Sequence, residues 1–333
     1  MALQHWFLTN IQQVQYSLGF MIEADSDVAC HMWLRHSKKI PQKHLKPIII
    51  RGVPGYMDAR FCFVAYDDLE QIEHGDTLHH TFIWPSWSVC QTRYFYLWAT
   101  NDGEAMISTS PIFEKHFVQL PDPTYFYPDP HIEATSVDGW VRQAVTCPAC
   151  SWSDVRDGAG DDSRDDGPEL ITMLWSWRNA GEYNAFYRII TLFDTSIIND
   201  DHTIYAAELL LFGKVKTVEP AWPASALSVV DSNPASDHEL VDSDYTTLGE
   251  TALSNLIPFA SIDDSGSNRF ILNLHGHAKI AREGITKLGI REHTYDRRNI
   301  EPPFSPHALA RADFWSSENV DILKRPTLIV WYD

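Results

Sequence analysis

The sequence predicts an all-β protein made of two β-sandwich, jelly-roll-like domains joined by a proline-rich linker. Short segments of alternating apolar and polar residues, rich in aromatic and β-branched side chains, follow one another along most of the chain. Turn-forming residues separate these segments, and few stretches carry a helical repeat of apolar positions. The length of 333 residues is about twice that of a typical domain, which leaves room for two hydrophobic cores.

The domain division follows from the position of the prolines. Four prolines fall between Pro121 and Pro130, where they interrupt any ladder of backbone hydrogen bonds. We therefore expect a jelly-roll-like sandwich over residues 1–120, a linker over 121–136 and a second sandwich over 137–333. Because residues 125–127 read Tyr-Phe-Tyr, the linker is expected to be ordered, extended and packed against a domain.

Each domain has its own set of expected strands. In the first domain they are 16–24, 28–35, 47–53, 60–66, 77–84 and 92–100, with a break at residues 25–27. In the second they are 170–177, 185–193, 204–213, 226–231, 270–274, 287–291 and 327–331. The segment 207–212 is apolar on both faces, which predicts a central strand.

Composition narrows the choice of partners. The chain holds 26 Lys and Arg against 45 Asp and Glu, and its net charge of -19 repels phosphate backbones and anionic lipids. No apolar run approaches the length of a membrane span, and residues 1–6 show no basic or apolar leader region. We therefore expect neither nucleic acid nor membrane as a partner. The five cysteines, an odd number, are interpreted as mostly reduced.

Several segments of the second domain carry a recurring pattern. They are 188–197 (RIITLFDTSI), 204–213 (IYAAELLLFG), 233–236 (NPAS), 244–245 (DY), 284–291 (GITKLGIR) and 325–330 (RPTLIV). In order and spacing, residues from about 132 to 333 resemble DNRLRE-type β-sandwich domains, which occur in phage particles and in bacterial surface and polysaccharide-active proteins. More weakly, residues 1–120 resemble the jelly-roll modules that precede such domains. The resemblance implies a sandwich without catalytic machinery.

No motif in the sequence points to catalysis. Gly-x-Ser-x-Gly, a glycine-rich phosphate loop and His-Glu-x-x-His are all absent. Cys147 and Cys150 have redox or zinc spacing, but no second such pair exists, so we interpret them as incidental or locally disulfide-bonded. On a strand, His275 and His277 would share one face, but two ligands do not complete a metal site. We expect no enzyme and no obligatory cofactor.

The acidic loop 157–169 is the candidate calcium site. Its possible ligands are Asp161, Asp162, Asp165 and Asp166, and hard carboxylate oxygens are what calcium prefers. The glycine that an EF-hand loop requires is replaced by Asp166, and the loop is more acidic than the resemblance leads us to expect. A solvated acidic loop is the alternative interpretation.

The tryptophans are the candidate ligand-binding residues. Trp175 and Trp177 lie two apart on one expected strand face, where they fill a core or form a platform for sugar rings. Trp222 lies in a Pro-Ala-Trp-Pro loop and is the stronger candidate for an exposed contact.

The leading functional hypothesis is a non-catalytic structural protein of a viral (phage) particle, such as a capsid-decorating, head-fibre or tail component. Its expected partners are other virion subunits or further copies of itself. The alternative is a carbohydrate-binding module that attaches to surface polysaccharide, with an extracellular or cell-surface location. Both hypotheses rest on the resemblance and on the absence of catalytic motifs.

Overall fold

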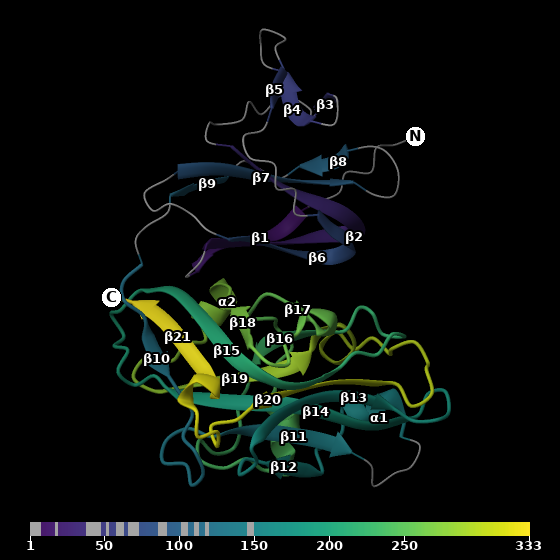
Figure 1. Cartoon of the computed structure of the whole chain (residues 1–333), viewed down its shortest axis with the longest axis vertical. Coiled ribbons are helices and arrows are strands. Elements are labelled where there is room, and N and C mark those ends of the chain that lie inside the picture. The colour runs from purple at the N-terminus through teal and green to yellow at the C-terminus, as the bar shows by residue number, and fades with distance from the viewer. Residues whose placement is uncertain are drawn as a thin grey trace. The chain divides into compact units, whose positions relative to one another are not determined.

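The computed structural model describes residues 8–16, 19–37, 48–50, 53–57, 63–65, 73–85, 92–100, 106–109, 113–116, 120–144 and 150–333. The chain divides into two compact units, Met1–Leu120 and Pro121–Asp333 (Figure 1). Among the described residues, no helix is both long and apolar enough to cross a membrane.

The described part of the first unit consists of antiparallel strands. They are β1 (Leu8–Tyr16), β2 (Gly19–Ser37), β3 (Ile48–Ile50), β4 (Val53–Met57), β5 (Phe63–Ala65), β6 (Glu73–Pro85), β7 (Thr92–Thr100), β8 (Met106–Thr109) and β9 (Phe113–His116). One sheet has the order β1-β2-β7-β8, with β6 also on β2 and β9 also on β7, and β3-β4-β5 form another. The predicted break at 25–27 is wrong, because β2 absorbs these turn-forming residues in a register shift between Asp25 and Cys30.

The second unit is built on one large antiparallel sheet that curves into a half-barrel. Its strands are β10 (Thr124–Phe126), β11 (Asp138–Ala144), β12 (Asp162–Arg164), β13 (Glu169–Ser176), β14 (Tyr183–Asp194), β15 (Ile204–Thr217), β16 (Ala226–Asp231), β17 (Ile257–Pro258), β18 (Ser267–Ile271), β19 (Ile285–Glu292), β20 (Leu309–Trp315) and β21 (Thr327–Tyr332). Their order is β10-β21-β15-β20-β13-β14-β19-β16-β17, with β11 on β14 and β12, and β18 on β15. The helical segments are short: α1 (Trp152–Arg156), α2 (Leu274–His277), η1 (Asp242–Thr247), η2 (Phe259–Ser261), η3 (His293–Arg297) and η4 (Ile322–Lys324).

Strand β15 pairs with three other strands of this sheet. Its first half pairs with β21 on one edge and β18 on the other, and its second half pairs with β20. The register shifts between Gly213 and Val215, and a Cβ at Gly213 would lie 1.9 Å from the Asp263 carbonyl oxygen. Glycine is therefore required where the strand bends. The predicted central position of this segment agrees with its pairing on both edges.

Residues of the predicted linker belong to the second unit. Strand β10 pairs with β21 through Thr124, Tyr125 and Phe126, and so adds an edge strand to the sheet. The flanking prolines fit this position, because an edge strand tolerates missing amide donors.

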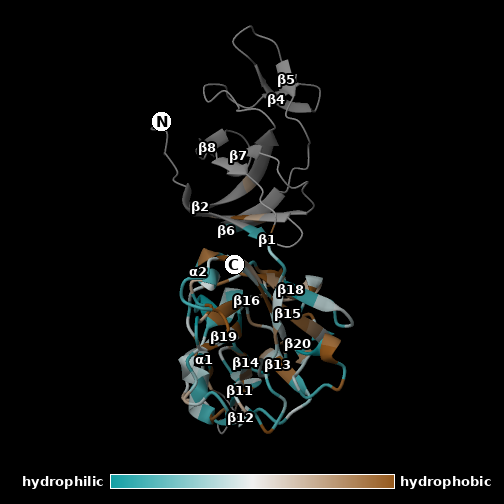
Figure 2. Ribbon diagram, turned by 90° about the vertical axis from the view of Figure 1, so that its left-hand side faces the viewer, coloured by the Kyte–Doolittle hydropathy of each residue, from teal (hydrophilic) through white to brown (hydrophobic). Residues whose placement is uncertain are grey.

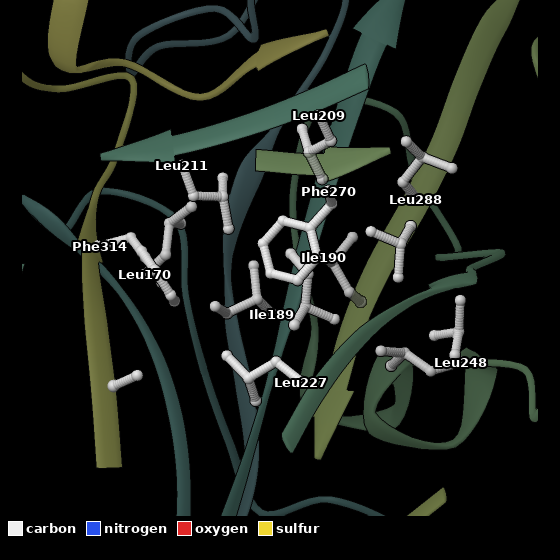
Figure 3. Packing of buried hydrophobic residues seen from close by; sticks show 14 of the residues in the cluster. Leu170, Ile189, Ile190, Leu209, Leu211, Leu227, Leu248, Phe270, Leu288 and Phe314 are labelled. Atoms are coloured by element: carbon white, nitrogen blue, oxygen red, sulfur yellow. The ribbon is translucent and has the colours of Figure 1, made fainter. Parts of the chain in front are cut away.

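The main core is formed by side chains from most strands of the curved sheet. Leu170, Ile189, Leu209 and Phe270 come from four different strands and point toward one another (Figure 3). Hydrophobic and hydrophilic positions are interspersed along the strands of this unit (Figure 2). On β13, alternation separates Leu170 and Leu174, which belong to the main core, from Ile171 and Met173, which belong to a second cluster. The structure is mostly β with few helices, which confirms the all-β class.

Helix α2 changes the interpretation of two histidines. His275 and His277 were expected to share a strand face, but they lie on this helix, where His275 is exposed and His277 is buried. Burial lowers the pKa of His277 to about 4, because the charged imidazolium loses its hydration.

The buried His277 predicts a loss of stability in acid. Below its ordinary pKa of 6.5 the unfolded chain takes up a proton that folded His277 does not accept until about pH 4. Between pH 7 and pH 4 this group should cost about 3 kcal/mol of unfolding free energy. Between pH 7 and pH 4, the wild type should therefore lose about 3 kcal/mol more unfolding free energy than a His277→Asn variant. Urea denaturation of both proteins at both pH values measures this difference. A constant difference would contradict this assignment.

Candidate functional site

The side of β13 opposite the main core carries a patch of aromatic side chains. On β13, Leu170 and Leu174 enter the main core, so Ile171, Met173 and Trp175 project from the opposite face. The strands on either side of β13 are β14 and β20. Side chains from neighbouring strands therefore meet around Met173.

Strand register determines which residues these are. Met173 lies opposite Tyr187 of β14 and Arg311 of β20, and Trp175 lies opposite Ala185 and Leu309. We call the whole set the aromatic face: Trp140, Arg142, Ile171, Met173, Trp175, Trp177, Ala185, Tyr187, His307, Leu309 and Arg311.

Some side chains of the aromatic face are buried, and others are partly exposed to solvent. Trp140, Ile171 and Met173 are only 7%, 8% and 7% exposed, whereas Trp175 and Trp177 are half-buried. The Trp175 and Trp177 ring centroids lie 6.4 Å apart at 66°, edge to face. His307 continues the row, with its ring 5.7 Å from that of Trp177. The two tryptophans therefore form an angled surface and not a flat one.

Arg142 forms the polar border of this face on the β11 side. Its guanidinium lies 5.6 Å from the Trp140 ring centroid and 5.4 Å from that of Tyr187. The same group forms an ion pair with Asp162 at 2.6 Å and donates a hydrogen bond to the Tyr187 hydroxyl. Arg142 is thus held in place beside the aromatic rings.

The β20 side has a border of its own. Arg311 donates hydrogen bonds of 2.7 and 2.6 Å to the two carboxylate oxygens of Asp313. Burial raises the pKa of Asp313 above its ordinary value, although these bonds act in the opposite direction. Lys214 lies 4.4 Å from the Trp315 ring centroid and pairs with Glu169. Donors and acceptors therefore surround an apolar centre.

The structure corrects the prediction for Trp222. This side chain is 1% exposed, packs in the main core and donates a hydrogen bond from Nε1 to the Pro303 carbonyl at 2.8 Å. Its ring centroid lies 6.1 Å from that of Tyr295. The flanking prolines predict a turn, but a turn does not fix the direction of the side chain. Trp222 is not an exposed contact.

The carboxylates of the acidic loop 157–169 have different partners in the structure. Asp161 accepts hydrogen bonds from the Ala144 amide and the Gln143 side chain, Asp162 pairs with Arg142, and Asp166 pairs with Arg164 at 2.9 Å. In the described part of the chain, the one group of three ligand-type side chains close enough to hold an ion contains Asp165 but none of the other three. The structure therefore does not gather the predicted calcium ligands at one point.

A buried charge cluster also resembles a functional site. Asp296 lies between Arg188 and Arg291, each of which donates two hydrogen bonds to its carboxylate, and all three are at most 3% exposed. Glu292 accepts hydrogen bonds from four backbone amides, those of Ala226, Thr294, Tyr295 and Asp296. Because these charges are satisfied by protein groups and are shielded from solvent, the cluster is structural.

The two cysteines with redox spacing are partly described. Cys150 is disulfide-bonded, and Cys147 lies outside the described residues. Cys150 also packs against the main core at its partly buried edge.

Compared with known proteins, the chain matches no protein-family model and no curated protein. The aromatic face was only partly predictable from the sequence. The rings of Trp175 and Trp177 are neighbours, although β13 ends at Ser176, before Trp177. Trp140, Tyr187 and Arg142 come from strands whose register the sequence does not reveal.

Proposed function

We propose that the second unit is a non-catalytic β-sandwich module that binds carbohydrate through the aromatic face. The observation that carries this proposal is the half-buried, edge-to-face pair Trp175 and Trp177. The same aromatic face holds Arg142, whose guanidinium lies over the Trp140 and Tyr187 rings and pairs with Asp162. Sugar rings combine an apolar C–H face with a rim of hydroxyl groups. An aromatic surface bordered by fixed charged groups matches both features.

The geometry of the pair also favours a kind of ligand. Because the two indoles meet at 66°, one sugar ring can stack on one indole while its edge contacts the other. A flat crystalline polysaccharide would require coplanar rings. A single sugar unit or a twisted soluble chain is therefore the ligand class that fits.

The proposal predicts a specific effect of Trp177→Ala. Loss of the indole should weaken glycan binding by up to about tenfold, since one aromatic contact contributes about 0.5–1.5 kcal/mol. A glycan array with the full chain identifies the ligand, and calorimetric titration compares the wild type, Trp177→Ala and Trp175→Ala.

Tyr125→Ala is the matched control, because Tyr125 is an aromatic residue of the edge strand β10 that is 53% exposed and lies outside the aromatic face. It should bind as the wild type does. The proposal would be overturned if the wild type bound no glycan on the array, or if all variants bound the glycan equally well.

The second candidate is a structural role in a viral particle, as an assembling subunit. It is favoured by the exposed segment around η4, where Val320, Ile322 and Leu323 are 97%, 50% and 80% exposed. Three large apolar side chains within four residues form a surface that a neighbouring subunit would cover. Sedimentation velocity showing defined oligomers, together with silence on the array, would favour this role.

A further inference from the structure

Three ligand-type side chains meet between the segment before β11 and the loop after β12. His131 and Glu133 come from the first segment and Asp165 from the second, and one ligand atom of each lies within 4.8 Å of the others. Strands β11 and β12 are paired, with Trp140 opposite Arg164, which brings the two segments together. The group is therefore fixed by the sheet.

The backbone around His131 is anchored on both sides. The Asp129 carboxylate accepts hydrogen bonds from the amides of Ala134 and Thr135 at 3.0 and 2.6 Å. The His131 amide donates a hydrogen bond to Glu318. On the other side of the group, Asp165 Oδ2 accepts a hydrogen bond from the Leu240 amide at 2.9 Å. These contacts place the three side chains before any ligand binds.

Glu133 carries the unexplained feature of this group. Its side chain is 1% exposed, and its Oε1 has no hydrogen-bond partner among the described residues. Its Oε2 lies 3.1 Å from His131 Nδ1. Burying a carboxylate oxygen without a partner is costly, so a ligand that satisfies Oε1 would stabilise the fold.

The charge balance points to a cation. The Glu133 side chain is buried, and a carboxylate oxygen of Asp165 lies within 4.8 Å of its ligand atom. Among the described residues, no Lys or Arg forms an ion pair with Glu133 or Asp165. Two carboxylates therefore face one histidine without a fixed positive charge.

We propose that His131, Glu133 and Asp165 bind a divalent transition-metal ion of the zinc type. An imidazole nitrogen with two carboxylate oxygens suits such ions, whereas calcium prefers oxygen ligands alone. In a tetrahedral zinc site, neighbouring ligand atoms lie about 3.3 Å apart. The 3.1 Å between His131 Nδ1 and Glu133 Oε2 is close to that separation. Water would occupy the fourth position.

Such an ion would fasten the start of the second unit to the acidic loop. His131 and Glu133 lie just before β11, and Asp165 directly follows β12, so one ion would link the two antiparallel strands at the end where β11 begins and β12 ends. Without an ion, Glu133 Oε2 contacts His131 Nδ1. With an ion bound, both atoms would contact the ion. Metal binding should therefore raise the unfolding temperature.

The test is calorimetric titration of the metal-stripped full chain with ZnCl2. The wild type should bind one Zn²⁺ ion that His131→Ala and Glu133→Gln either do not bind or bind at least about 100-fold more weakly. Asp166→Asn is the matched control, because Asp166 is a neighbouring carboxylate outside the group. It should bind as the wild type does. His131 is exposed, so its variant keeps the test valid even where Glu133→Gln fails to fold.

Cobalt provides a second measurement that separates this site from other histidines and cysteines. Co²⁺ should give the visible absorption of a four-coordinate site in the wild type and in Asp166→Asn, and lose it in His131→Ala. Equal zinc stoichiometry and affinity in the wild type and both ligand variants would overturn the proposal. Calcium binding in place of zinc at these residues would also overturn it.

Discussion

An Asp296→Asn variant is expected to lose about 3–5 kcal/mol of unfolding free energy, because it leaves two buried guanidinium groups without an anion. The Asp296 carboxylate accepts hydrogen bonds of 2.9 and 2.7 Å from Arg188 and of 3.0 and 2.7 Å from Arg291. Asparagine has a similar size but offers one acceptor oxygen and no charge. The loss is therefore electrostatic and does not depend on a new cavity.

Urea denaturation of the full chain, followed by tryptophan fluorescence, measures this effect. Asp166→Asn is the control, because Asp166 forms an ion pair with Arg164 in which both side chains are about half exposed. An exposed pair contributes at most about 1 kcal/mol. A loss in Asp296→Asn no greater than that in the control would mean that the cluster does not stabilise the fold.

The same cluster predicts a pH dependence. Although burial alone would raise it, the guanidinium groups of Arg188 and Arg291 hold the pKa of Asp296 well below its usual range. A lowered carboxyl pKa stabilises the folded state above the unfolded pKa, and this stabilisation is lost as the pH falls. The stabilities of the wild type and Asp296→Asn should therefore converge below about pH 4.

The all-β class could be predicted because alternation and turn residues act locally. Residues 226–231 form β16 with the predicted bounds, and 327–331 form all but the last residue of β21. Strand register could not be predicted, because it depends on pairing between distant segments. Arg188 and Arg291 illustrate this limit. Arg188 is the first residue of the segment 188–197, and Arg291 is the last residue of the segment 284–291. Only the pairing of Ile189 with Ile290 shows that they lie opposite each other and share Asp296.

The candidate sites show the same limit. Spacing predicted one strand face for Trp175 and Trp177, because strand geometry repeats every two residues. Their ring centroids lie 6.4 Å apart, although β13 ends at Ser176. Spacing could not show that Asp162, expected as a calcium ligand, instead holds Arg142 beside the aromatic rings. Nor could it show that Asp165 meets His131 and Glu133, which lie about thirty residues earlier in the chain. These groupings exist only once the β11 and β12 pair has formed.

Trp222→Ala is expected to destabilise the second unit by about 3–5 kcal/mol, the usual cost of removing a large aromatic side chain from a core. The indole is 1% exposed, packs near Tyr295 and hydrogen-bonds the Pro303 carbonyl. Its removal leaves both a cavity and an unpaired carbonyl oxygen. Loss of glycan binding in this variant would therefore report unfolding and not a lost contact.

Trp177→Ala provides the comparison that separates these two causes. Because Trp177 is half-buried at the edge of the aromatic face, its removal should cost less stability than that of Trp222 while it weakens glycan binding. Denaturation and glycan titration of both variants, at a temperature where the wild type is fully folded, measure the two effects independently. If Trp222→Ala were as stable as the wild type, its side chain could not be the core anchor that its burial indicates. If Trp177→Ala were the less stable of the two, the aromatic face would contribute to the core of this unit, and its role in binding would have to be reassigned.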